Sequence, residues 1–266
     1  MKNEIVVGAV SKIPTQDGIE STYQIMETCV KEYSHVDLLC FGELFLLKDP
    51  KYLDNIENEE ALKKITYQIR NLAIRYNMAI SYGCVLKERG KVYISQIVAF
   101  PDQSEYIYRK VHLGKNEKII YNYGDTIDVF NYRGYTFGIQ ICIDTHIMEM
   151  SILQKLMGAE IIIAPFNTPY DCKKRLKNWS KYIPMRAYEC NMCFICNNYH
   201  GGIQMVNGYG DVVRESIDTN CVEVYTFSKH KDFNENIDYF AYRRSNLYNC
   251  ITCGQAIKDE LMSYQE

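Results

Sequence analysis

The sequence predicts one α/β domain with mixed strand pairing and helices on the outer faces of its sheets. Short apolar runs rich in β-branched residues alternate with amphipathic helical segments along the chain. Between and after these units, apolar runs flank glycine-containing turns, which is the pattern of β-hairpins. No linker, low-complexity segment or internal repeat divides the 266 residues, so we expect a single domain over residues 1–266.

Two strand-and-helix units open the chain. The apolar runs at 4–10 and 36–41 predict buried strands. A helix follows each of them, near 18–34 and near 58–76, with apolar residues at helical spacing on one face. The core-facing residues are Met26, Cys29, Val30 and Tyr33 in the first helix and Leu62, Ile65, Ile69, Leu72, Ala73 and Tyr76 in the second.

The next section, residues 78–141, changes to pairs of strands. Two strands are predicted within 78–100 around a turn at Arg89–Gly90. A second pair lies within 127–142 around Arg133–Gly134. These antiparallel pairs make the strand pairing of the domain mixed.

Helices and strands then alternate again. We predict a helix at about 146–157, a strand at 159–166 and an amphipathic helix at 176–190, which Pro184 should kink or split. Hairpins should fill 192–227. Their turn signals are Asn207–Gly208 and Gly210–Asp211, and the polar, tyrosine-rich tail from about 231 shows no clear period.

Composition excludes several classes of protein. An apolar fraction of 47% with 24% charged residues is that of a globular protein. A net charge of −3 offers no polyanion-binding surface, so nucleic acid is not an expected partner. No apolar run reaches the roughly 18 residues that span a bilayer. Glu4 interrupts what would be the core of a signal peptide, so we expect a cytoplasmic protein that contacts no membrane.

Eleven cysteines are many for a chain expected in a reducing compartment, where disulfides are rare. Cys190, Cys193 and Cys196 cluster, and Cys250 and Cys253 follow, so zinc binding is an alternative. The segment around Cys193 reads as a buried strand, in which residues three apart point to opposite faces. We therefore favour buried thiols, since free cysteine packs as a small apolar residue.

Cys142 stands apart from the other cysteines. It follows the predicted strand TFGIQI and precedes a helical pattern. Such a strand-to-helix turn exposes a side chain at the edge of a sheet, and a helix N-terminus favours a thiolate. This is the geometry of a nucleophile elbow, although the segment alone leaves open one more buried cysteine.

A nucleophilic thiol needs a base and a donor for the developing oxyanion. The five histidines stand in no recognisable Cys–His signature. Glu43 ends an apolar run, where a charged side chain is costly unless it is paired, and Lys110 follows a predicted strand. A carboxylate and a lysine are therefore the candidate partners of Cys142.

Three motifs, in order, resemble the nitrilase superfamily, also called carbon–nitrogen hydrolases. They are FGELF around Glu43, YRKVHL around Lys110 and GIQICIDTHIMEM around Cys142. The further matches are Glu117, Gly124–Asp125, the run AEIIIAPF, and Trp179 with RAYECN. Because the resemblance spans most of residues 4–227 in the family's order, it implies the family's fold, a four-layer αββα sandwich of two mixed sheets.

The resemblance also implies a mechanism that needs neither a metal nor an organic cofactor. Glu43 would take the proton from Cys142, and the thiolate would attack the substrate carbon. Lys110 and the backbone N–H of Ile143 would stabilise the oxyanion, while Glu117 would position Lys110 or the substrate. A homodimer or higher homo-oligomer is implied too, with the predicted helix 176–190 and the tail from about 231 at its interface.

Asp144, two positions after the nucleophile, resembles the residue found in amidases and N-carbamoyl hydrolases. We therefore expect hydrolysis of a small amide or N-carbamoyl compound. Nitrile hydrolysis and a catalytically silent scaffold are the alternatives. Asp144 and Glu149 are expected to be structural, bonding loop amides and Arg or Lys partners. Ile147 and Met148 depart from the family's usual proline and aromatic, which leaves the substrate open.

Four residues are expected to bind the substrate: Ile143, His146, Asn167 and Arg175. His146 lies four residues past the nucleophile and is expected to face the same pocket. A loop from Pro165 to Trp179 follows the next strand and holds Lys173, Lys174 and Arg175. These cations favour an anionic substrate, and Arg175 is the best shaped to bind a carboxylate. A solvated loop face is the alternative for such a run of charge.

Overall fold

The computed structural model describes residues 3–15, 17–169, 171–235 and 239–245. The chain divides into two compact units, Met1–Asn234 and Glu235–Glu266. Within its described residues, the second unit contains a short 3₁₀ helix, η4 (Tyr239–Tyr242). The first unit contains both sheets and every residue predicted for the site.

Strands of the first unit form two sheets, each of six strands within the described residues. One sheet contains β1 (Glu4–Lys12), β2 (Leu38–Cys40), β3 (Ala79–Glu88), β4 (Lys91–Ala99), β5 (Glu105–Arg109) and β12 (Asn220–Ser228), in the order β12-β1-β2-β3-β4-β5. The other contains β6 (Phe130–Tyr132), β7 (Tyr135–Ile139), β8 (Ile161–Phe166), β9 (Cys193–Asn198), β10 (Ile203–Val206) and β11 (Val212–Ser216), in the order β11-β10-β9-β8-β7-β6.

Both sheets are mixed, as the sequence predicts. The central strands β1, β2 and β3 pair parallel, as do β7, β8 and β9. The outer pairs are antiparallel. The parallel strands are buried over most of their length, because helices cover one face and the other sheet covers the other.

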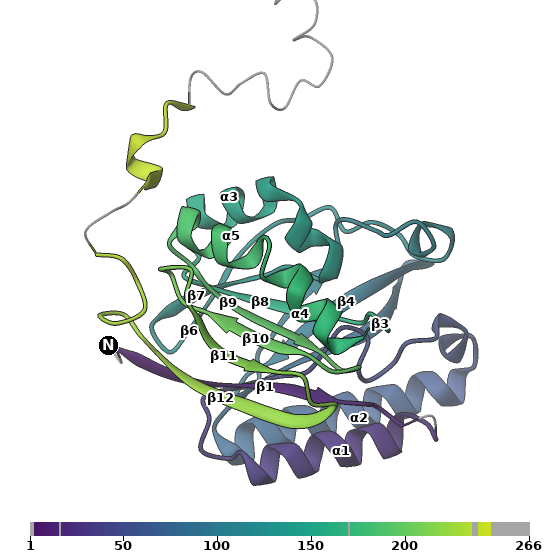
Figure 1. Ribbon diagram of the computed structural model, residues 1–266. Coiled ribbons are helices and arrows are strands. Elements are labelled where there is room, and N and C mark those ends of the chain that lie inside the picture. The colour runs from purple at the N-terminus through teal and green to yellow at the C-terminus, as the bar shows by residue number, and fades with distance from the viewer. Residues whose placement is uncertain (1–2, 16, 170, 236–238, 246–266) are drawn as a thin grey trace, which may run out of the picture. The chain divides into compact units, whose positions relative to one another are not determined.

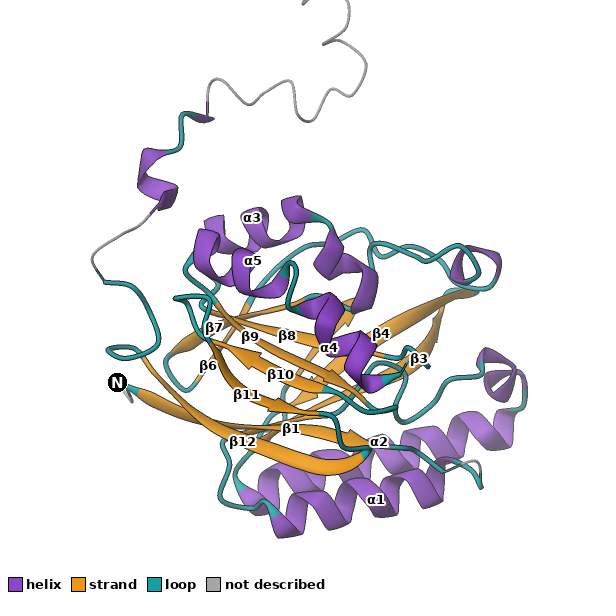
Figure 2. Ribbon diagram, viewed as in Figure 1, coloured by secondary structure: helices purple, strands orange, loops and turns teal. Residues whose placement is uncertain are grey.

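Helices lie on the outer face of each sheet (Figures 1 and 2). α1 (Ile19–Glu32) and α2 (Ile56–Tyr76) pack on the sheet that contains β1. α3 (Met148–Leu156), α4 (Cys172–Trp179) and α5 (Ile183–Cys190) pack on the other sheet. Strand β1 contacts β9 and β10, so the inner faces of the sheets meet. The four-layer αββα sandwich is thereby confirmed.

The long helix α2 shows how the local sequence selects this arrangement. Its predicted apolar stripe faces the sheet, and Tyr76 at its end is half-buried. Asn55 caps the helix by accepting a hydrogen bond from the Glu57 N–H at 2.8 Å. Because Asn55 is the cap, the helix starts at Ile56, two residues earlier than predicted. The buried residues are Leu62, Ile65, Ile69, Leu72 and Ala73.

The two predicted hairpin turns are confirmed. Arg89–Gly90 joins β3 to β4, and Arg133–Gly134 joins β6 to β7. All four residues have φ between 48° and 85°. A two-residue hairpin of this type requires positive φ at both positions, and the glycine meets that requirement without strain.

The prediction that hairpins fill 192–227 is wrong for the last strand. β9, β10 and β11 do pair as antiparallel neighbours. β12 instead crosses to the other sheet and pairs with β1 over its whole length, from Glu4 opposite Ser228 to Lys12 opposite Asn220. The edge of β1 away from β2 would otherwise expose unpaired backbone groups, and β12 covers it.

The predicted loop from Pro165 to Trp179 is wrong in its second half. α4 begins at Cys172, where Asp171 caps the helix by accepting a hydrogen bond from the Lys174 N–H at 3.0 Å. The split predicted at Pro184 is confirmed, since α4 ends at Trp179 and α5 begins at Ile183. Proline is tolerated in the first turn of α5 because the N–H groups there have no partner within the helix.

The clustered cysteines lie in the core. Cys190 ends α5, and Cys193 and Cys196 lie in β9, all of them buried. Cys250 and Cys253 lie outside the described residues. Within the part of the chain that the structure describes, no helix is both long and apolar enough to cross a membrane.

Candidate active site

Glu43 is placed by a close approach of two backbone segments. It follows β2, and its side chain is only 2% exposed. A Cβ added at Gly83 of β3 would lie 2.1 Å from the Leu44 nitrogen and 2.5 Å from the Gly42 oxygen. Only glycine at position 83 therefore lets the segment carrying Glu43 pass so close to β3.

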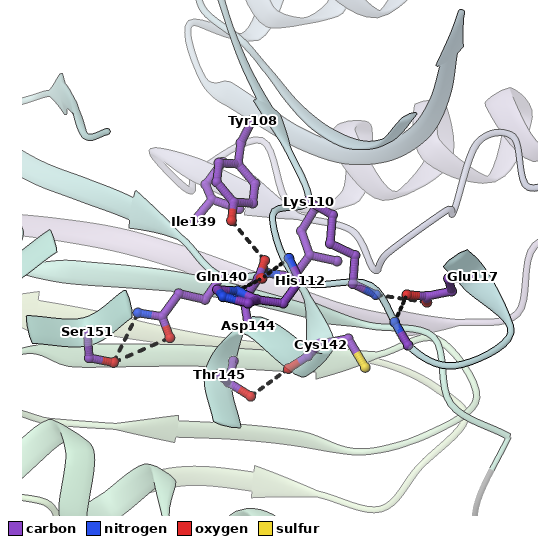
Figure 3. Close-up of polar contacts among 12 residues, drawn as sticks. Tyr108, Lys110, His112, Glu117, Ile139, Gln140, Cys142, Asp144, Thr145 and Ser151 are labelled. Atoms are coloured by element: carbon purple, nitrogen blue, oxygen red, sulfur yellow. Dashed lines mark hydrogen bonds and ion pairs between the residues drawn. The ribbon is translucent and has the colours of Figure 1, made fainter. Parts of the chain in front are cut away.

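Lys110 follows β5 and reaches the same interior, with a side chain that is 1% exposed. Its Nζ lies 2.7 Å from Glu43 Oε1 and 2.8 Å from Glu117 Oε1 (Figure 3 draws the contact with Glu117). Gly124 packs so tightly on this segment that a Cβ there would lie 2.2 Å from the Arg109 oxygen. One ammonium thus bridges two carboxylates.

Glu117 is held in turn by the backbone. Its Oε2 accepts a hydrogen bond from the Gly114 N–H at 2.7 Å, and its side chain is 28% exposed. It therefore lies on the more open side of Lys110, while Glu43 lies on the closed side. The structure brings Glu43, Lys110 and Glu117 together, as their match to the family's motifs implies.

Burial and charge oppose one another in this cluster. Burial raises the pKa of Glu43, and the neighbouring Lys110 only partly offsets this. Burial alone would lower the pKa of Lys110, but the charges of Glu43, Cys142 and Glu117 outweigh it and raise that pKa above its usual value. At neutral pH the lysine is a fixed cation, and the glutamate is a stronger base than an exposed carboxylate.

Cys142 lies at the predicted elbow. It begins a short 3₁₀ helix, η3 (Cys142–His146), and α3 follows at Met148. The backbone φ of Cys142 is +48°, a left-handed conformation that side chains other than glycine rarely adopt. Backbone strain of this kind is common at nucleophiles on strand-to-helix turns.

The thiol of Cys142 is not acidic in this environment. Burial, followed by the charge of Glu43, raises its pKa to about 12. Lys110, Thr168 and Arg175 each act to lower it. The expected stabilisation of a thiolate by a helix N-terminus is therefore outweighed, because one 3₁₀ turn supplies little dipole. At neutral pH the thiol is therefore protonated, and Glu43 is the charged group with the largest effect on its pKa.

Asp144 joins the elbow to the segment of Lys110 (Figure 3). It is fully buried, and its Oδ2 accepts from the Tyr108 hydroxyl at 2.8 Å and from the Ile141 N–H at 3.0 Å. Its Oδ1 accepts from the His112 N–H at 3.0 Å and lies 2.8 Å from His112 Nδ1. The expected bonds to loop amides are confirmed, but the side-chain partners are Tyr and His, not Arg or Lys. Glu149 lies exposed in the first turn of α3.

Arg175 is the buried member of the predicted cation run. It is 5% exposed, whereas Lys173 and Lys174 are exposed on α4. Its guanidinium carbon lies 5.5 Å from the centre of the Phe166 ring and 5.8 Å from that of Trp179. Its positive charge acts to lower the pKa values of both Cys142 and His146. One of the three cations is therefore buried, and its charge acts on Cys142.

The other three predicted substrate-binding residues are placed differently. Ile143 follows Cys142 and is half-buried. The backbone N–H of Asn167 donates to the Glu43 carboxylate, so this residue contacts the site. His146 is exposed and packs against Tyr182, with ring centres 4.4 Å apart and the rings tilted by 35°. The 3₁₀ turn, which has three residues per turn, displaces His146 from the position an α-helix would give it.

The sequence did not predict two polar contacts of Cys142. Thr168 Oγ1 lies 3.8 Å from Cys142 Sγ. The hydroxyl of Thr145 donates to the Cys142 carbonyl at 2.7 Å and lies 3.1 Å from the Tyr182 hydroxyl. Thr168 lies two residues after β8, and loops at the carboxyl ends of parallel strands line ligand-binding sites. This position in the sequence could have identified it as a site residue.

The arrangement suits covalent acyl transfer. It offers a thiol, a buried carboxylate of raised pKa and a fixed cation, whose charges act on one another. Within the described residues, no group of three or more His, Cys, Asp or Glu side chains is placed to hold a metal ion.

Solved structures with the same fold cover almost the whole chain. An amidase from a Nesterenkonia species has a TM-score of 0.79 at 18% identity, over 93% of this chain and 97% of that one. A carbon–nitrogen hydrolase from Helicobacter pylori G27 has a TM-score of 0.81 at 20% identity, over 94% of this chain and 98% of that one. At this identity the likeness shows the fold alone.

Two relatives match more closely over a shorter length. An (R)-stereoselective amidase from a Pseudomonas species is 29% identical over 164 residues, which are 61% of this chain and 59% of the relative. A probable nitrilase of Schizosaccharomyces pombe is 25% identical over 146 residues, which are 53% of this chain and 52% of the relative. The chain thus matches less than two thirds of either relative.

The sequence profile of the family "Carbon-nitrogen hydrolase" matches residues 9–219. The chain therefore belongs to the carbon–nitrogen hydrolase family.

Proposed function

We propose that this protein hydrolyses the C–N bond of a small amide or N-carbamoyl compound through a thioester on Cys142. Glu43 takes the thiol proton while the sulfur bonds to the carbonyl carbon. The C–N bond then breaks, and Glu43 returns the proton to the departing nitrogen. Water attacks the thioester, again giving a proton to Glu43, and the C–S bond breaks to restore the thiol.

The oxyanion that forms in both steps needs fixed donors. Lys110 is held as a cation between two carboxylates, and the backbone N–H of Ile143 follows the nucleophile directly. A preorganised donor of this kind contributes about 3–4 kcal/mol to the stability of the transition state. Glu117 keeps Lys110 in place from the open side. The observation that carries the proposal is the buried Glu43–Lys110 ion pair, whose two charges both act on the Cys142 thiol.

A panel of small substrates tests this function. It contains aliphatic amides, N-carbamoyl amines, N-carbamoyl amino acids and nitriles. Ammonia alone indicates an amidase or a nitrilase, whereas ammonia with carbon dioxide indicates a carbamoyl hydrolase. The enzyme quenched during turnover should carry the acyl mass on the peptide containing Cys142. Turnover of nitriles alone would favour the nitrilase alternative. If no substrate of the panel were turned over and none left an acyl mass on the Cys142 peptide, the silent scaffold would be favoured.

We also propose that the substrate carries a carboxylate or a similar anion away from the scissile bond. Arg175 supports this, because its charge acts on Cys142 and a buried guanidinium can bind a carboxylate with two hydrogen bonds. Arg175→Ala is expected to lower kcat/KM for an N-carbamoyl or ω-amide acid by roughly 2–3 kcal/mol, or about 30- to 150-fold.

The neutral methyl ester of the same compound is the comparison substrate. It should be a poor substrate of the wild type and should lose little in Arg175→Ala. Lys174→Ala, an exposed neighbour on α4, is the matched control. Equal use of the acid and its ester by the wild type would contradict an anionic substrate.

A homodimer through α3 and α5 is the third part of the proposal. Both helices expose large apolar side chains, which on a single chain would contact water. They are Met148, Leu153, Leu156 and Met185, with Met157 directly after α3, and they are between 40% and 62% exposed. Leu156→Glu should convert the protein to a monomer in light scattering after gel filtration, and a monomeric wild type would exclude this interface.

A further inference from the structure

The segment that follows β8 contacts both the base and the nucleophile. The backbone N–H of Asn167 donates to the Glu43 carboxylate. The next residue, Thr168, has its hydroxyl 3.8 Å from Cys142 Sγ, within hydrogen-bonding range for sulfur. Two adjacent residues thus contact the two groups between which the first proton must move.

The position of this segment is fixed by one buried side chain of the neighbouring strand, Asn198. The Asn198 amide is fully buried at the end of β9. Its Oδ1 accepts from the Thr168 N–H at 3.0 Å, and its Nδ2 donates to the Thr168 carbonyl at 3.0 Å. These two bonds hold the Thr168 backbone from both sides, two residues beyond the pairing of Phe166 with Asn198.

Asn167 is anchored separately. His200 Nε2 lies 3.2 Å from the side-chain oxygen of Asn167. Burial, with the charge of Lys48, lowers the pKa of His200, so the ring is neutral at neutral pH and can offer one N–H. Because both residues of the segment have partners, the Thr168 hydroxyl has a defined place and needs little reorganisation during the reaction.

We propose that Thr168 is a further catalytic residue, whose hydroxyl donates a hydrogen bond to the Cys142 sulfur and stabilises the thiolate formed when Glu43 takes the thiol proton. This inference rests on the proposed function of Cys142 and Glu43. The proton passes from sulfur to the Glu43 carboxylate, while Thr168 keeps its own proton. Since a hydroxyl rotates freely, Thr168 can accept from the thiol before the transfer and donate to the thiolate after it.

Thr168→Val and Thr168→Ser separate the hydroxyl from the shape of the side chain. Valine keeps the branched shape without the hydroxyl, and serine keeps the hydroxyl. Thr136→Val is the matched control, because Thr136 is also half-buried and its hydroxyl donates to Asn131 Oδ1 at 2.8 Å, in β7 away from the site. Melting temperatures of all three variants show whether each one folds.

The direct readout is alkylation of Cys142 by iodoacetamide at a fixed pH of about 8, followed on the Cys142 peptide by mass spectrometry. The reactive form is the thiolate, so the rate follows its small population. Thr168→Val is expected to slow alkylation and to lower kcat each by about tenfold, the effect of losing a hydrogen bond to a charged group. Thr168→Ser should recover most of both rates, and Thr136→Val should match the wild type.

Two results would overturn the inference. Alkylation of Thr168→Val at the wild-type rate would show that the hydroxyl does not stabilise the thiolate, even if turnover fell. Slow alkylation in Thr168→Ser equal to that in Thr168→Val would show that shape matters and the hydroxyl does not. Alkylation requires no substrate, so a wild type that turned over no amide would contradict the proposed function and leave the contact between Thr168 and Cys142 supported.

Discussion

Cys142→Ala is expected to abolish hydrolysis, with kcat lower by about five to six orders of magnitude, as when other covalent hydrolases lose their nucleophile. Without sulfur no thioester forms, so the acyl mass on the enzyme should vanish together with turnover. Cys142→Ser should be nearly as inactive, because a hydroxyl is a far weaker nucleophile at the same place.

The fold should survive the loss of the thiol. The Cys142 side chain fills little volume and contacts Thr168 at 3.8 Å, and the left-handed backbone strain at this position stays the same in alanine. Melting curves of wild type and variant should therefore agree within a few degrees. Cys221→Ala, a half-exposed cysteine in β12, is the matched control and should keep full activity. Substantial hydrolysis by Cys142→Ala would exclude the thioester mechanism.

Glu43→Gln and Lys110→Ala are each expected to lower kcat by roughly three orders of magnitude or more. Glutamine keeps the shape of Glu43 but cannot take the thiol proton. Alanine at position 110 removes the cation that pairs with Glu43 and that, in the proposed mechanism, stabilises the oxyanion. Because the two side chains are joined by a 2.7 Å ion pair, the double variant should be little worse than either single one.

Lys110→Ala should also destabilise the fold. It leaves Glu43, which is 2% exposed, without its counter-charge, and breaking a buried pair in this way costs about 3–5 kcal/mol. Urea unfolding measures this loss. Lys87→Ala breaks the more exposed 3.0 Å pair with Asp54 and should cost less than about 1 kcal/mol. Defects in kcat that multiply in the double variant would show that Glu43 and Lys110 act independently.

The pH dependence of kcat/KM reports on the same base. Glu43 must be deprotonated to accept the thiol proton, and burial raises its pKa. Activity should therefore be present above this raised pKa and be lost as the pH falls through it, at a higher pH than the roughly 4.3 of an exposed glutamate. The residual activity of Glu43→Gln should lack this acid limb. An acid limb at the ordinary value would show that the carboxylate is solvated during turnover.

Local sequence patterns alone determined much of the secondary structure of this protein and the identity of its candidate site residues. The helix stripes, the strand runs and the glycine turns at Arg89–Gly90 and Arg133–Gly134 depend on neighbours within a few residues. The break between α4 and α5, just before Pro184, is equally local, because the proline ring removes a backbone N–H and clashes with the preceding turn. The match of Glu43, Lys110 and Cys142 to three motifs was also visible in the sequence, because each motif is contiguous along the chain.

Only the tertiary structure decided the contacts between distant segments. β12 crossed to β1 because the unpaired strand edge lies in the other sheet, which no local turn signal reports. Arg175 is buried because Asp171 caps α4 and so fixes where the helix begins. The start of the helix decides which of the three adjacent cations faces the core. Thr168 met Cys142 because its backbone pairs with an amide 30 residues away. Hydrogen-bond partners and burial are properties of packing between segments. The motifs along the sequence therefore predicted that Glu43, Lys110 and Cys142 share one site, but they could not predict how the groups around these residues are oriented.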